Sequence, residues 1–362
     1  MKFKTTKETL FGNIQITQNI ISPRVSLPIL SNMLLETIEG ALRLVTTDLD
    51  IGISCEFPVE VVESGTITVP SKRFAEIIHE LPSGEVTISA KKNNMVIIEA
   101  EACEFKIMGL PKEEFPKLPE FKDKEVIKIQ QAVLKEMLSK TSFAVSHDET
   151  RYILNGILFK IENDTISMVA TDGRRLALIE KKLNAGIHKK IHLIVPIKTI
   201  HELNRNLKDE GEGLIVLGEN QVLFDLGPIH IISRIIEGEF PDYRQVIPAE
   251  QKDKIKLNRE KFLLAVRRAA ILSTLDYQAI KLEVFKNKLV VSKSTPDIGE
   301  SREELVSEYS GKELIIGFNP AYLIDALKNI QEEEIFFELT DSEKPAAIRI
   351  DSYTYIVLPM RI

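Results

Sequence analysis

Two aspartates that follow threonines are the side chains of this sequence best suited to do chemistry. Asp48 stands after Thr47, and Asp172 stands after Thr171. Paired carboxylates can hold Mg²⁺ for phosphoryl transfer, so one alternative is a metal-dependent nuclease. The two aspartates, however, lie in different copies of an internal repeat, which would place them a domain apart. Because aspartate after threonine also caps turns through its side chain, we expect turn capping at both positions.

Histidines and cysteines offer no stronger chemistry. His188 and His192 flank a strand-like run, in which a spacing of four residues separates two side chains widely, so we expect no metal pair there. Cys55 and Cys103 have no basic or histidine neighbours in the sequence, and we expect both to be buried small hydrophobic residues. The sequence contains no GxxxxGK[ST], HExxH or CxxC motif. We therefore predict no catalytic residue, no metal, no cofactor and a protein that is not an enzyme.

The elements that must position these residues occur in three similar passages of about 120 residues. The motif Val-Pro-x-Lys at 69–72 returns at 195–198, and Glu-Phe-Pro at 114–116 returns at 239–241. Apolar residues at positions i, i+3, i+4 and i+7 predict amphipathic helices. The predicted helices span residues 4–20, 71–81, 128–141, 197–208, 258–273 and 320–330.

Short runs rich in valine and isoleucine between these helices predict strands. Each passage reads helix, several strands, helix, several strands, which is not the alternation of a Rossmann fold or a TIM barrel. We predict an α+β fold of three tandem copies of one domain topology, with helices and antiparallel sheets. A charged, proline-containing stretch at 116–124 and a polar stretch at 249–254 are candidate boundaries. The predicted domains span residues 1–121, 122–248 and 249–362.

Composition favours a folded chain of more than one domain. The 362 residues are 44% hydrophobic and 28% charged, which excludes disorder as the main state. No apolar run approaches the roughly 20 residues that span a bilayer, and the first residues do not resemble a signal peptide. We expect a cytoplasmic protein with no membrane partner.

Charge is divided unevenly along the sequence. The six predicted helices carry a net charge of +8, so the rest of the chain carries −15 to give the total of −7. A basic helix face is often merely solvated, and chance is one interpretation. The other is a helix-lined surface that tolerates DNA without gripping it, because few close phosphate contacts give weak binding.

Seven segments resemble one known family, the bacterial sliding clamps, which are the beta subunits of replicative DNA polymerase III. The segments are SPRVSLPIL (22–30), RYILNGILF (151–159), ATDGRRLA (170–177), GEFPDYRQVIP (238–248), RRAAILS (267–273), GFNPAYLIDAL (317–327) and YIVLPMRI (355–362). The resemblance covers the whole chain. It implies a head-to-tail homodimer that closes into a ring, encircles duplex DNA regardless of sequence and tethers the polymerase for processivity.

The same resemblance implies partners and a docking pocket. The partners would be the replicative polymerase, a clamp loader, repair polymerases, ligase and mismatch repair proteins, each docking a short peptide between the second and third domains. The implied pocket residues are Leu154, Thr171, Gly173, Arg174, Arg175, Leu176, Pro241, Val246, Tyr277, Asn319, Tyr322, Ile356, Leu358, Pro359, Met360 and Arg361. Arg174, Gln245 and Tyr277 depart from the family pattern, so we expect a shift in peptide choice.

Contacts with DNA and between two chains are also implied. Tyr152 and Lys198 match DNA-contacting positions of the family, and Arg24 lies in the matching segment 22–30. Arg267 and Arg268 are added because their predicted helix is basic. The ring interface would pair Phe105 and Ile107 of one chain with Ile271 and Leu272 of the other. Phe105 and Ile107 alternate at period two, which puts them on one side of an edge strand. Besides a clamp, the sequence leaves open the nuclease and an interaction scaffold that never meets DNA.

Overall fold

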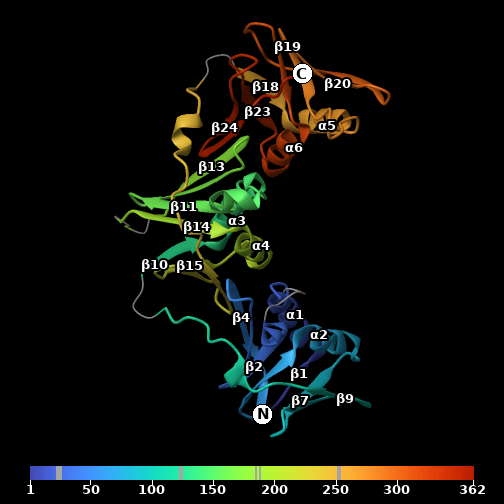
Figure 1. Cartoon of the computed structure of the whole chain (residues 1–362), viewed down its shortest axis with the longest axis vertical. Coiled ribbons are helices and arrows are strands. Elements are labelled where there is room, and N and C mark those ends of the chain that lie inside the picture. Colours follow the sequence, from blue (N-terminus) through green and yellow to red (C-terminus); the bar gives the residue numbers. More distant parts are fainter. Residues whose placement is uncertain (22–26, 122–124, 184–185, 187–188, 251–253) are drawn as a thin grey trace. The chain divides into compact units, whose positions relative to one another are not determined.

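The computed structural model describes residues 1–21, 27–121, 125–183, 186, 189–250 and 254–362 (Figure 1). The first repeat contains β1 (Lys2–Thr6), α1 (Lys7–Gln18), η1 (Pro28–Ser31), β2 (Asn32–Ile38), β3 (Ala41–Thr47), β4 (Ile51–Pro58), β5 (Glu60–Glu63), β6 (Thr66–Pro70), α2 (Ser71–Glu80), β7 (Glu85–Ala90), β8 (Met95–Ala100), β9 (Cys103–Met108) and η2 (Lys112–Glu114). The second contains β10 (Val126–Gln130), α3 (Gln131–Ser139), η3 (Ser142–Ala144), η4 (Glu149–Leu154), β11 (Gly156–Glu162), β12 (Thr165–Thr171), β13 (Arg175–Lys182), β14 (Ile191–Pro196), α4 (Ile197–Asn206), β15 (Glu212–Leu217), β16 (Gln221–Asp225), β17 (Ile229–Arg234) and η5 (Tyr243–Val246). The third contains β18 (Lys254–Asn258), α5 (Arg259–Ala270), β19 (Ile280–Phe285), β20 (Lys288–Thr295), β21 (Gly299–Val306), β22 (Leu314–Phe318), α6 (Pro320–Asn329), β23 (Glu334–Glu338), β24 (Ala346–Ile350) and β25 (Tyr353–Val357).

The order of helices and strands is the same in the three copies apart from one extra strand, β5, in the first, and all strand pairs between named strands are antiparallel. The predicted α+β fold in three copies of one topology is thereby confirmed, as are six helices among the described residues. One feature of the prediction was wrong: each copy opens with a strand, and the predicted helices 4–20 and 128–141 begin inside the strands β1 and β10. The strand is only five residues long and runs directly into the helix, so its alternation is masked by the helical pattern that follows.

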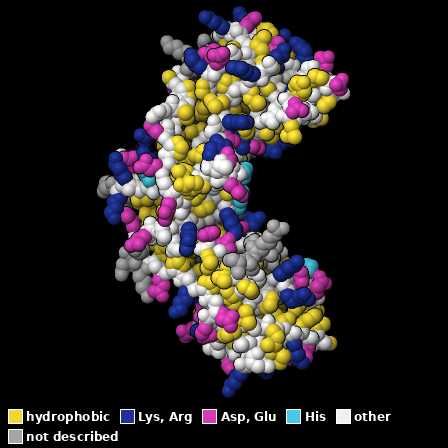
Figure 2. All heavy atoms as spheres, in the orientation of Figure 1, with side chains coloured by type: hydrophobic (Ala, Val, Ile, Leu, Met, Phe, Trp, Pro, Cys, Tyr) yellow, Lys and Arg dark blue, Asp and Glu magenta, His cyan; other side chains and the backbone are white. Residues whose placement is uncertain are grey.

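The shorter helices also change the charge division. Lys4, Lys128, Lys140 and Lys208 lie outside the helices as folded, so the six helices carry a net charge of +4 instead of +8. Figure 2 shows Lys and Arg side chains lying among Asp and Glu side chains on the viewed surface. The helices therefore keep a net positive charge of half the predicted size, and the rest of the chain carries −11 to give the total of −7.

The first compact unit comprises Met1–Leu134 and His201–Ile235. Its five-stranded sheet has the order β5-β1-β7-β8-β9, and its eight-stranded sheet the order β10-β15-β16-β17-β4-β3-β2-β6. The pairing of β17 with β4 joins strands of the first and second repeats into one sheet. Helices α1 and α2 pack against each other, and the predicted apolar face of α2, Phe74, Ile77, Ile78 and Leu81, is buried.

The second compact unit comprises Lys135–Ile200 and Ile236–Ile362. Its eight-stranded sheet has the order β14-β11-β12-β13-β25-β24-β23-β18, and its four-stranded sheet the order β21-β20-β19-β22. Here β13 of the second repeat pairs with β25 of the third. Each eight-stranded sheet thus contains strands of two repeats. For this reason the three repeats of the sequence form two compact units, and the second repeat is divided between them.

The third repeat packs α5 against α6. The side chain of Asn258 caps α5 by accepting a hydrogen bond from the Lys261 N–H at 3.0 Å, and Asn319 caps α6 in the same way. The predicted apolar face of α6 is buried, with Leu323, Ala326, Leu327 and Ile330 at most 2% exposed. Among the described helices, none is both long and apolar enough to cross a lipid bilayer.

Candidate functional site

Asp48 caps the turn between β3 and β4, as predicted. Its Oδ1 accepts hydrogen bonds from the backbone N–H of Asp50 at 3.0 Å and of Ile51 at 2.8 Å. The hydroxyl of Thr47 donates to the Ile51 carbonyl and accepts from the Leu49 N–H, both at 3.0 Å. Leu49 has a φ of 80°, a left-handed conformation that costs a residue with a side chain about 1–2 kcal/mol.

Asp172 caps the corresponding turn between β12 and β13 with the same set of bonds. Its Oδ1 accepts from the N–H of Arg174 at 2.9 Å and of Arg175 at 3.0 Å. The hydroxyl of Thr171 donates to the Arg175 carbonyl at 2.6 Å and accepts from the Gly173 N–H at 3.0 Å. Gly173 has a φ of 85°. Turn capping by both aspartates is thus confirmed.

Arg175 distinguishes the second turn. Its Nε binds Asp172 Oδ2 at 3.0 Å, and its Nη1 binds Asp325 Oδ2, on α6, at 2.7 Å. The guanidinium also lies over the ring of Tyr322, 4.6 Å from the centroid, and near the ring of Phe143 at 5.6 Å. Burial by itself lowers the pKa of Arg175, but the hydrogen bond to Asp325 and the neighbouring carboxylates leave that pKa raised. The arginine therefore stays charged and fastens the second repeat to the third.

A cavity of about 170 Å³ opens beside this turn, and we call it the linker cavity because the segment 236–248 between the second and third repeats forms one wall. Its lining is Leu154, Thr171, Gly173, Arg174, Arg175, Leu176, Pro241, Asp242, Tyr243, Val246, Ile356 and Leu358. Ten of the sixteen predicted pocket residues are in this set. An apolar cavity with a few polar groups at its rim suits a small apolar side chain presented by a ligand.

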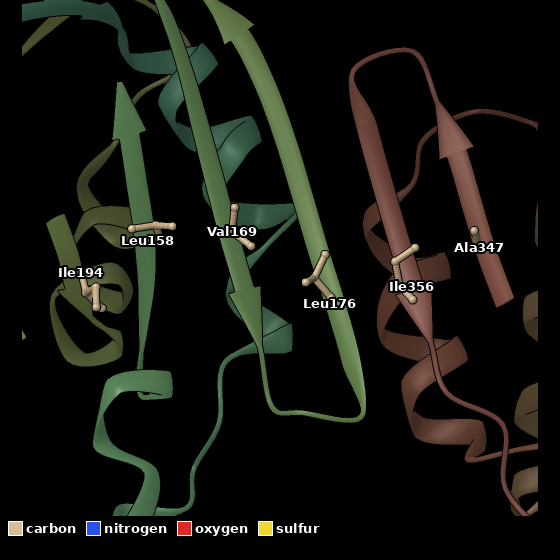
Figure 3. Close-up of a cluster of buried hydrophobic side chains, with 6 residues drawn as sticks. All are labelled: Leu158, Val169, Leu176, Ile194, Ala347 and Ile356. Atoms are coloured by element: carbon tan, nitrogen blue, oxygen red, sulfur yellow. The ribbon is translucent and has the colours of Figure 1, made fainter. Parts of the chain in front are cut away.

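The sheet beneath the linker cavity is continuous across two repeats (Figure 3). Buried apolar side chains from β11, β12, β13, β14, β24 and β25 share this region, namely Leu158, Val169, Leu176, Ile194, Ala347 and Ile356. Partly buried side chains pack against them, namely Ile153, Leu178, Ile236, Phe240, Tyr243 and Ile247. The linker thus covers an apolar sheet surface, and the cavity is the part of that surface that the linker leaves open.

A second cavity, of about 880 Å³, lies at the end of the chain, and we call it the tail cavity. Of the predicted pocket residues it is lined by Tyr277, Met360 and Arg361. The Met360 N–H bonds the Gly317 carbonyl at 2.8 Å, so the last residues follow the edge strand β22. The tail Leu358–Ile362 reaches both cavities, since Leu358 lines the linker cavity. The predicted pocket is thus divided between two cavities joined by the tail.

Three predicted pocket residues line neither cavity. Asn319 accepts a hydrogen bond from the Ala321 N–H at 3.0 Å as the cap of α6. The ring of Tyr322 packs against the guanidinium of Arg175, and the Tyr322 carbonyl accepts a hydrogen bond from the hydroxyl of Tyr355 at 2.8 Å. Pro359 lies in the tail between the two cavities. Asn319 and Tyr322 therefore contribute to the site indirectly, Asn319 by capping α6 and Tyr322 by packing against Arg175.

Sequence reasoning missed three residues of the site. Asp242 and Tyr243 line the linker cavity, and Asp242 holds Gln245 at the rim through a 2.9 Å hydrogen bond. Arg151 donates from Nη1 to the Asp172 carbonyl at 2.8 Å, and from Nε to Asp148 Oδ2 at 2.9 Å. The signal was available, because the motif segments used for the resemblance include all three residues.

The predicted DNA contacts have different surroundings. Arg24 lies outside the described residues. Tyr152 is 57% exposed, and the side chains of Lys198 and Arg267 are exposed on α4 and α5. Arg268 forms a bidentate pair with Glu303, at 2.8 and 2.6 Å, which raises its pKa. This pair offsets the charge that Arg268 could offer to a phosphate.

The predicted ring-interface residues lie on exposed parts of their repeats. Phe105 and Ile107 alternate on β9, an edge strand of the five-stranded sheet, and Phe105 is 39% exposed. Ile271 directly follows α5 and is 78% exposed, while Leu272 is half-buried. Exposed apolar side chains on an open sheet edge are typical of surfaces that pair with another chain.

The predictions for the cysteines and histidines have mixed outcomes. Cys55 is buried, as predicted, and burial raises the pKa of its thiol to about 11. Cys103 is exposed, so that prediction was wrong; it lies on β9, where the sheet has no further strand to cover it. His188 lies outside the described residues. Within the described ranges, no group of three or more histidine, cysteine or acidic side chains could hold a metal ion.

Family models of the DNA polymerase III beta subunit match the chain in three consecutive stretches. The N-terminal domain model matches residues 1–119, the central domain model 128–242 and the C-terminal domain model 244–361. The beta sliding clamp of Chlamydia pneumoniae is 31% identical over 363 residues, covering 100% of this chain and 99% of that relative.

Solved structures give the same result for the fold. The sliding clamp from Bacillus subtilis is 32% identical, with a TM-score of 0.96 over 100% of this chain and 99% of that one. A sliding clamp from Bartonella birtlesii, bound to griselimycin, is 32% identical, with a TM-score of 0.94 over 100% of both chains.

Proposed function

Because this chain belongs to the family of DNA polymerase III beta subunits, the bacterial sliding clamps, we propose that two copies close head to tail into a ring around duplex DNA. The ring tethers the replicative polymerase, and its processivity comes from topology, since a closed ring cannot leave the duplex sideways. Each chain supplies three domains, with the limits 1–121, 122–248 and 249–362. We propose that the protein acts in the cytoplasm, because the DNA that a bacterial replication factor binds is located there.

The linker cavity is the observation that carries the partner-docking part of this proposal. It has an apolar floor from Leu176, Ile356 and Leu358 and charged groups at its edge, which suits a peptide with an apolar anchor and a polar backbone. The Bartonella birtlesii clamp was solved with griselimycin bound. We propose that the linker and tail cavities together take the peptides of the polymerase, the clamp loader, repair polymerases, ligase and mismatch repair proteins.

Contacts with DNA are proposed to be few and weak. Tyr152, Lys198 and Arg267 offer exposed side chains, and Arg24 is included from its sequence match. Arg268 contributes less, because Nε and Nη2 of its guanidinium already donate hydrogen bonds to the Glu303 carboxylate. A ring that slides needs such a surface, since each close phosphate contact increases the salt-dependent grip.

No catalytic role is proposed. Both candidate carboxylates serve turns, and Asp172 also pairs with Arg175. A nuclease built on Asp48 and Asp172 would need them free to hold a metal ion. The chain is proposed to act as a non-catalytic subunit without a cofactor.

Retention on DNA tests the ring. The protein is loaded with its clamp loader and ATP onto circular duplex at moderate salt, and half of the sample is then linearised. We expect retention on circles and loss from linear ends. Equal retention on both would indicate charge-driven binding and contradict the ring, whereas retention on neither would favour a scaffold that does not meet DNA.

A matched variant separates ring closure from partner docking. Ile271→Asp places a charge at the proposed ring interface, so we expect it to abolish retention on circles. The linker cavity should still bind a labelled peptide with a leucine and a phenylalanine anchor, measured by fluorescence polarisation. Loss of both properties together would mean that the variant damages the fold of the third repeat.

A further inference from the structure

Lys293 is a buried lysine that the proposed function does not use. It lies on β20 and is 6% exposed. Its Nζ donates hydrogen bonds to the carbonyls of Tyr277 at 2.7 Å and Ala279 at 2.8 Å. In the described part of the chain it forms no salt bridge with a carboxylate, and burial lowers its pKa.

These two carbonyls belong to the segment 271–279, which connects α5 to β19. Strand β20 also holds the other end of this segment, because the hydroxyl of Thr295 donates to the Leu272 carbonyl at 2.6 Å. The remaining bonds of the segment include short-range ones, such as that from the Tyr277 N–H to Thr274 Oγ1 at 3.2 Å. The segment is therefore fastened to the sheet through its backbone.

Side-chain packing contributes little to the position of the middle of this segment, residues 275–277. Leu275 is 90% exposed and Tyr277 is 51% exposed, so neither side chain is anchored in a core. Burying an ammonium group is costly unless it is hydrogen-bonded, and charge-assisted bonds to two carbonyls provide that compensation. A methionine side chain would fill a similar volume without the desolvation cost of a buried ammonium group. We therefore look for the role of Lys293 in its hydrogen bonds to the Tyr277 and Ala279 carbonyls and not in packing.

The segment forms a wall of the tail cavity, which is lined by Tyr277, Lys293 and the chain end Met360–Ile362. We propose that Lys293 is a positioning residue for partner docking: by holding the Tyr277 and Ala279 carbonyls, it fixes Tyr277 as the wall against which an extended peptide packs. This inference rests on the proposed function, since it assigns the tail cavity to the same ligands. It adds a specificity determinant that acts on peptides reaching beyond the linker cavity.

A spectroscopic test needs no ligand. The chain contains no tryptophan, so Tyr277→Trp makes this segment the sole source of tryptophan fluorescence. Adding Lys293→Met should lower the anisotropy of that tryptophan and increase its quenching by acrylamide. Lys281→Met is the matched control, because Lys281 lines the same cavity but pairs with Glu283 at 3.1 Å. Unchanged anisotropy in Lys293→Met, or an equal change in the control, would overturn the proposal.

A binding test uses two fluorescein-labelled peptides with the same leucine–phenylalanine anchor, one of five residues and one extended by five residues on each side. Without Tyr277→Trp, Lys293→Met should weaken the long peptide about tenfold, or about 1.4 kcal/mol, and leave the short one unchanged. Lys293→Arg, which can donate to both carbonyls, should restore most of the loss. Equal weakening of both peptides would indicate general damage and contradict a positioning role. If the wild-type chain bound neither peptide, the proposed function would fail, while the fluorescence result would still stand.

Discussion

The turns at residues 47–51 and 171–175 have the same hydrogen bonds and a similar backbone conformation at the third residue, but only the second turn forms a bond to another repeat. Both have a threonine and an aspartate with the same bonds, and the third residue has a φ of 80° in one and 85° in the other. The fifth residue differs: Ile51 is buried in its sheet, whereas Arg175 binds Asp325 150 residues further along the chain. The comparison teaches that threonine and aspartate build the turn, while one neighbouring position decides whether the turn joins two repeats.

The linker segments that pass beside the two turns, residues 116–121 and 236–248, also differ. A Cβ atom on Gly52 would lie 2.6 Å from Leu118 Cδ2, so in the first repeat the linker leucine covers the glycine that follows the turn. In the second repeat Leu176 follows the turn and lines the open linker cavity. At the position that follows the turn, the first copy is thus filled by a linker side chain, and the second copy leaves room for a ligand.

Arg175→Met should have the largest effect in this comparison. It removes a buried cation between Asp172 and Asp325 and leaves both carboxylates without their partner, which we expect to cost about 3 kcal/mol of unfolding free energy. Thermal unfolding measures this loss, and peptide binding to the linker cavity should also disappear. Arg174→Met changes the exposed neighbouring residue and should leave the free energy of unfolding nearly unchanged. If it lowered that free energy as much as Arg175→Met does, the ion pairs of Arg175 would not be the cause of the loss.

Gly52→Leu should have the next largest effect. The new side chain copies Leu176 but meets Leu118, and overpacking of this kind costs about 1–3 kcal/mol. Chemical denaturation measures the change. The double variant Gly52→Leu with Leu118→Ala should recover part of the stability; if it does not, Leu118 is not the obstacle.

The same substitution at the two aspartates gives a direct contrast. Asparagine keeps the capping oxygen but not the charge, so Asp48→Asn should stay within about 0.5 kcal/mol of the parent chain. Asp172→Asn places an amide against Arg175 and should lose about 1–2 kcal/mol. Equal losses would mean that Asp172 has no role beyond its turn. A nuclease assay on both variants should show no change, whereas loss of a cleavage activity would revive the enzyme alternative.

The third residue of each turn should give the smallest effect. Gly173→Ala forces a side chain into a left-handed conformation, 2.9 Å from Arg151 Nη1, and should cost about 1 kcal/mol. Leu49→Gly removes that strain but increases the freedom of the unfolded chain, so the two terms nearly cancel. Urea denaturation compares them, and a destabilising Leu49→Gly would show that the Leu49 side chain contributes packing.

The sequence by itself determined the local structure. The apolar spacing of helices such as 71–81 and 320–330 correctly predicted their buried faces, and the threonine–aspartate pairs correctly predicted capped turns. These features depend on residues a few positions apart, where periodicity and side-chain bonding are visible in the sequence. The motif segments also named ten residues that line the linker cavity, because those segments carried the family resemblance.

Only the tertiary structure decided which distant residues meet. The pairing of β13 with β25, the bond between Arg175 and Asp325, and the bonds of Lys293 to the Tyr277 segment depend on how chain segments come together. Cys103 was misjudged for the same reason, since the burial of a strand residue depends on which other elements cover the strand, and the residues of β9 by themselves do not show that most of its side chains stay exposed. The division of the pocket into two cavities likewise arises from the path of the linker and the tail over a shared sheet. Such contacts reflect burial and shape across the whole unit, and no local pattern of residue types encodes them.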